Sequence, residues 1–548
     1  MIDSKDSAPG GRGARGGTLA LAAAALVLAG ACADHKARAP AGGQGQGTCG
    51  NGAVDAGEQC DGANLAGQTC TSLGLPGNAL ACAVNCTFNT SACVAPGSVF
   101  PLAISPSKNA LVDASGRPFL MQGDAAWSAI AELSEADAQL YLDDRKSRGF
   151  NTILVNLVEH QFTDHTPYPA NAAGDLPFTG LATCTPAQPS DHPCYDMSTT
   201  NDAYFAHVDW FLGQALSRGI LVLLAPAYMG WGGTQDGWIN EMKATGTAKL
   251  GTYGQYLGAR YKNQPNVIWV DGGDYTPANA GEMALVTAII DGIQAAGDAH
   301  LHTAHWGGYS TYPGEGYTPH PPWIDVDTIY YTSPPNISMY AVPGYLQDGG
   351  VRPVFFIEGN YENEHGTTPL QLRSQMYQPL LAGEAGFVMG VGTVWNFWSP
   401  GTGGSNGNAY SNDGKYPGGW KTALGSPGAA SAQRAGQLFS GLPWQSLVPD
   451  LGGTPLITAG SVQSGGDAMG TRSADGGTAL VYTISLASFT VDMTRMKGST
   501  TASWFDPSNG ATSAVPGSPF LNSGSRQFTP PGNTADGSTD WVLVLQSP

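Results

Sequence analysis

Residues 266–275, with the sequence NVIWVDGGDY, contain the pattern on which the interpretation of the central chain rests. The apolar run from Val267 to Val270 breaks off into Asp-Gly-Gly-Asp. Consecutive apolar residues are typical of a parallel strand that is covered on both faces. Two acids and two glycines directly after such a strand indicate a sharp turn that presents a carboxylate at the edge of the sheet.

Seven other short runs of the chain are also mainly apolar, and segments with helical periodicity separate them. The runs are PFLMQGD (118–124), FNTILVNLV (150–158), GILVLLAPAY (219–228), LHTAHW (301–306), DTIYYTS (327–333), PVFFIEGN (353–360) and FVMGVGTVWNFW (387–398). The predicted helices are 134–149, 201–219, 247–261, 278–297 and 369–385. The first of them begins with Ser134 as an N-cap and stops at Gly149, as helices commonly do.

Strands that alternate with helices predict parallel βαβ units, and eight repeats close naturally into a (β/α)8 barrel. A doubly wound open sheet is the alternative, but no G-x-G-x-x-G motif follows the first strand. We therefore assign the chain to the α/β class, with a (β/α)8 TIM barrel over residues 100–445.

The pattern of apolar and polar residues changes near residue 446. ALVYTISL (479–486), FTVDM (489–493), TASWF (501–505) and DWVLVLQ (540–546) alternate like antiparallel strands, with a turn at 507–510. This pattern predicts a small antiparallel β-sandwich over residues 446–548.

Residues 1–32 predict an export signal. Arg12 and Arg15 precede an apolar core at 18–30 that is too short for a permanent membrane-spanning helix. Small residues then lead to Cys32, which fits either an ordinary A-x-A cleavage or a lipoprotein signal in which Cys32 is lipidated. Residues 33–48 follow as a flexible tether.

The cysteine count favours the lipidated form. The chain has nine cysteines, and setting Cys32 aside leaves an even number, which in an exported chain predicts disulfides. We expect three bridges in a small disulfide-rich module at 49–94, which resembles a cysteine-rich repeat of exported myxobacterial proteins. We expect a fourth bridge between Cys184 and Cys194. A zinc site is not indicated, because no second ligand pair follows Cys82 and Cys86.

The candidate site residues are the polar and aromatic residues at the predicted strand ends. In a barrel of this class the carboxyl ends of the strands meet at one face, the mouth, where catalytic residues gather. The candidates are Asp124, Trp127, Asn156, His160, Tyr228, Asp271, Asp274, His305, Glu358, Tyr361, Glu362, Trp395, Asn396 and Trp398.

Several acids among abundant Trp and Tyr favour glycoside hydrolysis. That reaction needs an acid to protonate the leaving oxygen and a second carboxylate at the anomeric carbon. The fourth and seventh strands lie across the mouth from each other, so we predict Asp274 and Glu358 as the catalytic pair. The other candidates are predicted to bind substrate, with Trp395 and Trp398 stacking on sugar faces or packing in the core.

Three motifs carry a resemblance to a known family. NVIWVDGGDY, PVFFIEGNYE and QGDAAW resemble the strand-end motifs of the apiosidase-like catalytic domain, glycoside hydrolase family 140, also catalogued as domain of unknown function 4038. The resemblance spans residues 100–445 and implies a retaining glycosidase, with Asp274 as acid/base and Glu358 as nucleophile. The last hundred residues resemble the domain that follows this family, which is catalogued as collagen-binding; packing against the barrel is the plainer interpretation.

Two residues depart from the family pattern. Asp271 stands where the family has an apolar residue, and could compete with Asp274 or raise its pKa by like-charge repulsion. Gly359 replaces a proline after Glu358, and could loosen that loop. They leave an alternative open, a non-catalytic carbohydrate- or matrix-binding surface protein on a barrel scaffold. A collagen-directed adhesin is a further alternative.

The insertion 161–200 is rich in Pro and contains Cys184 and Cys194. Because a bridge would stiffen a loop that overhangs the mouth, we expect it to line the substrate subsites.

Composition limits the partners. A net charge of −19 argues against a nucleic-acid partner, which needs a basic face. His302 and His305 are expected on opposite strand faces, so no metal is predicted, and no cofactor motif is present. We expect a monomer that acts on a carbohydrate substrate. The protein is expected to contact the membrane only through a lipid anchor at its N-terminus. It would be a cell-surface or outer-membrane lipoprotein, or secreted.

Overall fold

The computed structural model describes residues 98–548 apart from 164, 189–191, 307, 310–320, 333–351, 401–414 and 451–452, together with parts of 51–89. The predicted signal, tether and lipidation site Cys32 lie outside the described residues, as do Cys49 and Cys93. Within the described part, no helix has the length and apolar character needed to cross a membrane.

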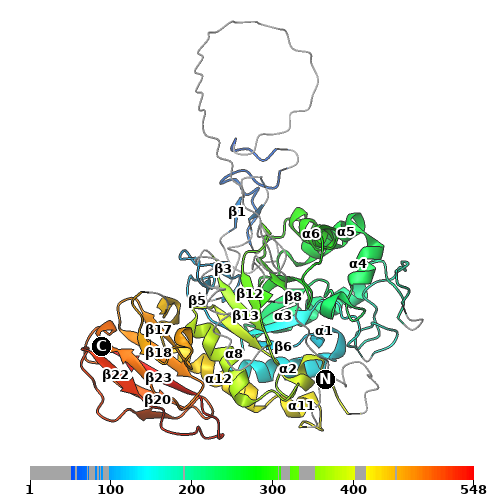
Figure 1. The fold of residues 1–548 in the computed structure, drawn as a ribbon. Coiled ribbons are helices and arrows are strands. Elements are labelled where there is room, and N and C mark those ends of the chain that lie inside the picture. The colour runs from blue at the N-terminus through cyan, green and yellow to red at the C-terminus, as the bar shows by residue number, and fades with distance from the viewer. Residues whose placement is uncertain are drawn as a thin grey trace, which may run out of the picture.

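The centre of the molecule is a barrel of parallel strands, which confirms the predicted fold (Figure 1). In sheet order from one side of the seam to the other, the strands are β10 (His302–His305), β9 (Val267–Gly272), β8 (Leu221–Ala225), β7 (Thr152–Asn156), β6 (Met121–Ala125), β14 (Gly386–Met389), β13 (Val354–Glu358) and β12 (Asp327–Tyr330). A short strand, β11 (Gly308–Tyr309), pairs antiparallel with β12.

The seam between β10 and β12 is closed by a few separate hydrogen bonds, from both backbone and side chains, rather than by a strand ladder. Thr303 Oγ1 donates to the carbonyl of Val326 at 2.6 Å, and Thr328 Oγ1 donates to the carbonyl of Ala304 at 2.5 Å. The fifth strand is thereby fixed beside the sixth, which holds the end of β10 at the mouth.

Helices cover the outside of the barrel. They are α1 (Ala129–Glu132), α2 (Glu135–Ser147), α3 (Asp202–Ser217), α4 (Ile239–Thr245), α5 (Thr247–Tyr261), α6 (Ala280–Ala295), α8 (Pro369–Leu381), α9 (Gly392–Trp395), α11 (Trp420–Ala423) and α12 (Pro427–Ser440). The Ser134 side chain accepts a hydrogen bond from the Asp137 amide and caps α2, as its sequence predicts.

Two of the predicted strands are divided between different elements. The run 118–124 divides into β5 (Pro118–Phe119) and β6, and β5 joins a small sheet with β3 (Ala103–Ile104) and β4 (Leu111–Val112). The run 387–398 leaves the sheet at Met389 and forms helix α9. Apolar content alone does not separate a buried strand from a buried turn of helix.

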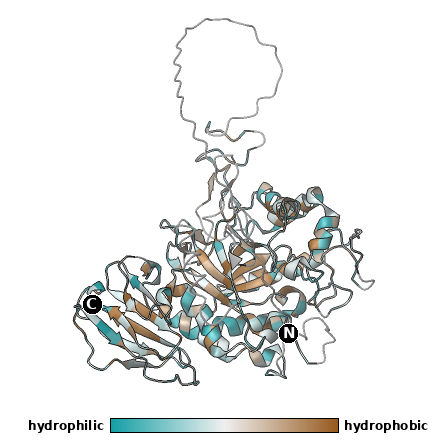
Figure 2. Cartoon of the chain, in the orientation of Figure 1, coloured by the Kyte–Doolittle hydropathy of each residue, from teal (hydrophilic) through white to brown (hydrophobic). Residues whose placement is uncertain are grey.

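Alternate side chains of each strand enter one of two cores. Ile268 and Val270 lie in the core inside the barrel, whereas Val267 and Trp269 lie in the core between the strands and the helices. Both faces of the sheet are therefore apolar, and the barrel strands are brown along their length in Figure 2. This alternation decides which strand-end residues face the mouth.

The C-terminal segment forms the predicted β-sandwich. One sheet contains β15 (Leu447–Pro449), β17 (Ala468–Ser473), β18 (Thr478–Thr483), β23 (Trp541–Gln546), β20 (Thr501–Phe505) and β21 (Thr512–Ala514), and the other contains β16 (Ile457–Ala459), β19 (Phe489–Asp492) and β22 (Ser525–Phe528). Both sheets are antiparallel, and a shared apolar core fills the space between them.

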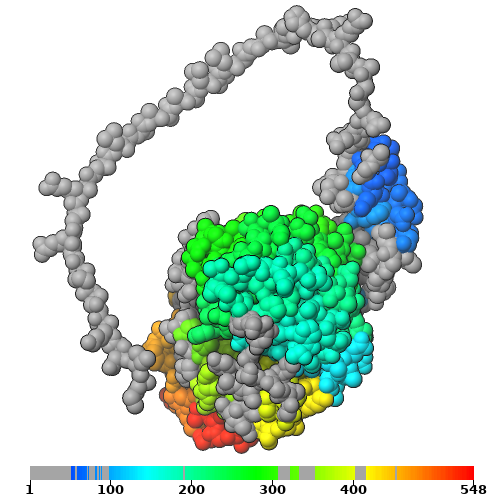
Figure 3. Space-filling view, turned by 90° about the vertical axis from the view of Figure 1, so that its right-hand side faces the viewer, coloured from blue at the N-terminus to red at the C-terminus, as the bar shows by residue number. Residues whose placement is uncertain are grey.

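The sandwich packs directly on helix α8, and the two parts form one continuous body in Figure 3. Arg373 of α8 donates two hydrogen bonds of 2.7 Å to Asp540 and one of 2.7 Å to Asp536. The rings of Tyr377 and Tyr482 stack with their centroids 5.1 Å apart. The C-terminal domain therefore supports the barrel whatever else it does.

Disulfides join Cys60 to Cys82 in the N-terminal module and Cys184 to Cys194 in the insertion. Cys70 and Cys86 each take part in a disulfide as well. The two short strands of the module are β1 (Ala81–Cys82) and β2 (Phe88–Asn89).

Candidate active site

One imidazole and two carboxylates meet at the carboxyl ends of three strands. His305, the last residue of β10, is hydrogen-bonded through Nε2 to Oε2 of Glu358, the last residue of β13. The Nδ1 atom of His305 lies 3.6 Å from Oδ1 of Asp274, two residues beyond β9. One carboxylate oxygen of Asp274 and one of Glu358 lie within 4.8 Å of each other. The structure thus brings together the two acids predicted as the catalytic pair.

The two glycines after β9 allow this approach. Gly272 has φ +91°, and a Cβ there would lie 2.6 Å from Nε1 of Trp306. A Cβ on Gly273 would lie 2.6 Å from the Met229 amide nitrogen and 2.8 Å from the Tyr228 ring. Contacts this close exclude any side chain, so only Gly-Gly turns Asp274 into the mouth.

An irregular step in β13 aims Glu358 in the same direction. Phe355 and Ile357 both lie in the core inside the barrel, so strict alternation would point Glu358 outward. The pairing register shifts here, because Ile329 pairs with Phe356 while the next residue, Tyr330, pairs with Glu358. A bulge of this kind re-aims a side chain, and it brings Glu358 to the mouth.

Aromatic residues surround the two carboxylates. The Tyr228 hydroxyl donates to Oδ2 of Asp274 at 2.7 Å, and Trp127 Nε1 donates to the Tyr361 hydroxyl at 2.9 Å. Trp127 also meets the His305 ring edge-on, with the ring centroids 5.0 Å apart. Trp127, Tyr228, His305 and Tyr361 therefore lie at the site, as predicted from their strand ends.

Burial and charge set the ionisation of the group. Burial, followed by the charge of Asp274, raises the pKa of Glu358, although hydrogen bonds from His305 and Tyr361 act in the opposite direction. Burial lowers the pKa of His305, but Glu358 and Asp274 together outweigh it, so the pKa is raised. Glu358 and His305 are hydrogen-bonded to each other, so the protonation of one depends on that of the other.

Two of the residues predicted to contact substrate point away from the mouth of the barrel. Asp271 follows Trp269 on the outer face of β9, and its Oδ2 lies 2.8 Å from Nδ1 of His302. Asp124 on β6 is fully buried, accepts a hydrogen bond of 2.7 Å from Tyr141, and pairs with Arg145 at 3.3 Å. Both positions are set by strand alternation, which places these two acids behind the sheet rather than in the mouth.

Glu362 also has a structural position. Its Oε2 accepts a hydrogen bond of 3.0 Å from the amide of Gly428 in the first turn of α12. A carboxylate at a helix N-terminus is stabilised by the free amides there. The structure therefore places the Glu362 carboxylate against the first turn of α12.

The second strand supports the insertion. Asn156 Nδ2 donates to Glu159 at 3.2 Å, and His160 lies 3.4 Å from Glu241 of α4 and 3.3 Å from the Tyr168 hydroxyl. These contacts tie the start of the insertion 161–200 to the barrel. The structure does not bring Asn156 or His160 into hydrogen-bond contact with the carboxylate pair.

The eighth strand end contributes one aromatic residue beside the mouth. Trp395 Nε1 donates to Glu364 at 2.8 Å, and its ring meets Phe162 of the insertion at 4.9 Å. Asn396 accepts a hydrogen bond of 3.2 Å from the Trp398 amide, and the Trp398 carbonyl accepts one from Trp420. These two residues shape the loop after β14.

The loop after Glu358 is tightly held, contrary to the loosening expected from Gly359. The Gln375 side chain accepts a hydrogen bond of 2.7 Å from the Asn360 amide and donates one of 2.9 Å to the Asn360 carbonyl. A Cβ on Gly359 would lie 2.6 Å from Oε1 of Gln375. Glycine is therefore the residue that this packing requires.

Three residues near the pair were not predicted. Tyr330, at the end of β12, lies with its ring 5.0 Å from that of His305, and Glu364 binds Trp395. Asp236 lies in the loop after β8, where burial and the nearby charge of Asp274 raise its pKa. Tyr330 lies in the middle of the predicted run 327–333, and only the observed end of β12 places it at the mouth; the other two lie in loops without a recognisable motif.

The three central groups are also of a kind that binds divalent metals. Nε2 of His305 is hydrogen-bonded to Glu358, and Nδ1 faces Asp274.

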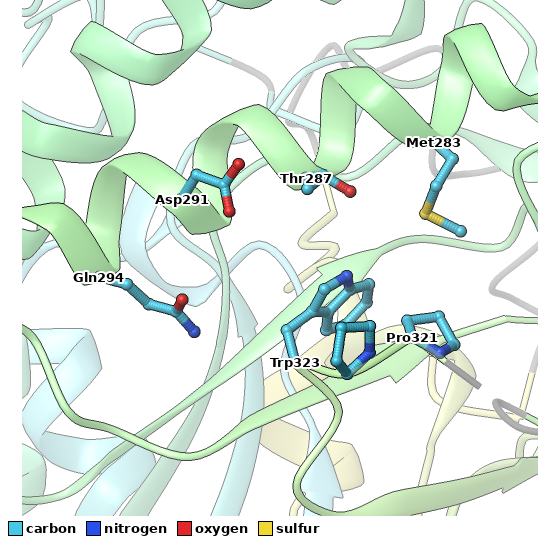
Figure 4. A pocket seen from close by; sticks show the side chains of 7 residues that line it. Met283, Thr287, Asp291, Gln294, Pro321 and Trp323 are labelled. Atoms are coloured by element: carbon cyan, nitrogen blue, oxygen red, sulfur yellow. The ribbon is translucent and has the colours of Figure 1, made fainter. Parts of the chain in front are cut away.

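A separate groove of about 390 Å³ lies between α6 and the segment that leads into β12. Figure 4 shows Met283, Thr287 and Asp291 on one side of α6, facing Trp323 and Pro321. The segment precedes the start of β12, and its Trp323 ring meets that of Trp306, the residue after His305, with the ring centroids 5.9 Å apart. None of the predicted site residues lines this groove.

The whole barrel matches a described family. The model of the "Apiosidase-like, catalytic domain" matches residues 105–446, and that of the "Putative collagen-binding domain of a collagenase" matches residues 448–546. The chain therefore belongs to the apiosidase-like family. It is a glycoside hydrolase with a TIM-barrel catalytic domain.

Solved structures show the same fold. A structure described as "Glycoside hydrolase" is 22% identical with a TM-score of 0.65, and covers 82% of this chain and 97% of its own. A glycoside hydrolase family 5 structure from Bacteroides vulgatus is 21% identical with a TM-score of 0.64, and covers 82% and 94%. No curated protein sequence matches the chain.

Proposed function

We propose that this glycoside hydrolase cleaves sugars from polysaccharide side chains with retention of configuration. Asp274 is the acid/base and Glu358 is the nucleophile. The observation that carries this proposal is the short distance between the two acids, with an oxygen of each within 4.8 Å of the other. Carboxyl groups about 5–5.5 Å apart are typical of retaining enzymes, whereas inverting enzymes leave room for a water at about 6.5–9.5 Å.

In the first step Glu358 attacks the anomeric carbon while Asp274 protonates the leaving oxygen. Burial and the charge of Asp274 raise the pKa of Glu358, and the charge and hydrogen bond of His305 and the hydrogen bond of Tyr361 oppose this rise, which favours the ionised, nucleophilic form. The Tyr228 hydroxyl donates to Oδ2 of Asp274, whereas Oδ1 faces Nδ1 of His305 at 3.6 Å. Oδ1, the oxygen that Tyr228 does not occupy, is assigned the proton that is delivered to the leaving oxygen.

In the second step Asp274, now ionised, removes a proton from water, which attacks the glycosyl–Glu358 ester. The charge of Asp274 is then no longer next to a second ionised carboxylate, because Glu358 is esterified.

The apiosidase-like family description supports apiose as the released residue, and we extend the proposal to other uncommon sugars of plant or microbial polysaccharides. The predicted signal and the disulfides support an exported protein, either lipid-anchored at Cys32 or secreted.

The departures Asp271 and Gly359, which left a non-catalytic binding protein open, do not disturb the pair. Asp271 faces away from it, and Gly359 is held by packing. No observation on the described residues favours the binding protein.

The test is sugar release from plant and bacterial polysaccharides by the intact protein, by Glu358→Ala and by Asp274→Ala. Release that both substitutions abolish would support the assignment, and the product would name the sugar. Release that survives both would remove Asp274 and Glu358 from the mechanism. Binding without release by the intact protein would favour the non-catalytic alternative.

A further inference from the structure

The loop 230–237, between β8 and α4, presents an aromatic ring to solvent beside the catalytic acid. Trp231 is 68% exposed, whereas Trp127 and Tyr228 at the same mouth are each 6% exposed. Exposing a Trp side chain of this size forgoes about 1.5–3 kcal/mol of burial, so such a residue calls for an explanation beyond packing.

The loop is fixed to the backbone of Asp274. The amide of Gly232 donates to the carbonyl of Asp274 at 3.0 Å. A Cβ on Gly233 would lie 2.9 Å from the Tyr275 ring, so this glycine lets the loop lie flat against the residue after the acid. Tyr275 is in turn held by a hydrogen bond of 2.7 Å to Glu282 of α6.

The loop is also closed on itself. Gly230 has φ +91°, and a Cβ there would lie 2.7 Å from the Thr234 carbonyl. The carbonyl of Trp231 accepts hydrogen bonds from the amide and the hydroxyl of Thr234, at 3.2 and 2.7 Å. The loop is therefore preorganised, because ligand binding would cost it little further conformational entropy.

Asp236 adds a polar group on the same loop. Its carboxylate is half-buried, is hydrogen-bonded by Thr234, and lies within electrostatic reach of Asp274 and His160. It therefore lies on the mouth side of the loop, between the acid and the start of the insertion. A carboxylate in this position accepts hydrogen bonds from sugar hydroxyls.

We propose that the loop 230–237 is the leaving-group subsite, in which Trp231 stacks on the C–H face of the sugar that departs with the oxygen protonated by Asp274. Asp236 accepts a hydrogen bond from a hydroxyl of that sugar. This inference rests on the proposed function, because it takes Asp274 as the acid. It adds that the group released on this side is itself a saccharide, since a small alcohol would leave the ring of Trp231 uncovered.

The test measures binding in a Glu358→Gln background, so that no turnover intervenes. Affinity electrophoresis in gels containing pectin, arabinoxylan or xanthan compares this parent with added Trp231→Ala, Trp231→Phe or Leu521→Ala. Leu521 is a matched control, because it is 74% exposed and lies in the C-terminal domain. Wild-type sugar release from the same polymers is measured in parallel.

For the polymer that retards the parent, Trp231→Ala is expected to weaken binding about 10-fold, as for the loss of one aromatic stack. Trp231→Phe should keep most of the affinity, and Leu521→Ala should keep all of it. Equal binding by Trp231→Ala and the parent, with wild-type release intact, would overturn the subsite and leave the proposed function standing. Failure of every polymer both to bind and to release sugar would overturn the two together.

Discussion

His305 is hydrogen-bonded to Glu358 at the point where the fifth and seventh strands of the barrel end. The same imidazole lies 3.6 Å from Asp274 on the other side. A single ring thus connects the two proposed catalytic acids, and it is the group best placed to decide which of them carries a proton.

Removing the charge of His305 should move the pH profile in a defined direction. His305 lowers the pKa of Glu358, so His305→Gln, which keeps a hydrogen-bond donor without the charge, should raise it. The nucleophile must be ionised, and the acidic limb of kcat/KM should therefore move to higher pH by about one unit, a typical effect of one nearby charge. A limb that stays in place or moves to lower pH would contradict this role.

The hydrogen bond from Tyr228 to Asp274 should contribute to catalysis. Tyr228→Phe removes a donor 2.7 Å from Oδ2 and leaves the ring in place. A hydrogen bond to a charged group contributes about 1.5–3 kcal/mol, so kcat/KM should fall about 10- to 100-fold. The midpoint of urea unfolding serves as the control, and a kinetic loss explained by unfolding would count against the prediction.

The bridge between Cys184 and Cys194 should affect substrate affinity. Its loop belongs to the insertion that His160 and Tyr168 tie to the barrel, and both cysteines are nearly buried. The double variant Cys184→Ser/Cys194→Ser should raise KM several-fold with little change in kcat, because the loop loses its order but the carboxylate pair does not. An unchanged KM would show that the insertion does not line the subsites.

The contact between the barrel and the sandwich should dominate stability. Arg373 and Asp540 are 1% and 0% exposed in their side chains, so Arg373→Met leaves an uncompensated buried carboxylate. The loss should be about 3–5 kcal/mol in the free energy of unfolding. Arg373→Met/Asp540→Leu should recover much of it, and a double variant no more stable than the single one would argue against this account.

Glu384 should make stability depend on pH. It is fully buried between α8 and β14, neither oxygen has a partner among the described residues, and burial raises its pKa well above the usual value. A raised pKa in the folded state means that stability is complete below the unfolded pKa and is lost as the pH rises. Glu384→Gln should therefore raise Tm by a few degrees at pH 8 and leave it unchanged near pH 4.

Much of this site could be predicted because it follows from strand order. The strand ends placed Asp274, His305 and Glu358 at one mouth, and the glycines after Val270 signalled the turn that aims Asp274. The errors arose where direction matters more than position. Asp124 and Asp271 are each the last residue but one of their strands and face the helices. A pattern of apolar residues on both faces does not show which way a polar residue points.

Other features depend on contacts between distant segments. The register shift that re-aims Glu358 is visible only against its partner β12, and the seam at Thr303 and Thr328 involves side chains that read as ordinary strand residues. The packing that fixes Gly359 comes from Gln375 of the following helix. Such relationships have no signature within a single segment.

The most direct test of the central claim is the mass of the peptide that contains Glu358, after rapid acid quenching of the protein during turnover. Asp274→Ala, supplied with the released sugar as its aryl glycoside, should accumulate an adduct of one sugar residue on Glu358, because the second step has lost its base. Glu358→Ala should show none. An adduct on another residue, or a product of inverted configuration without any adduct, would contradict the account.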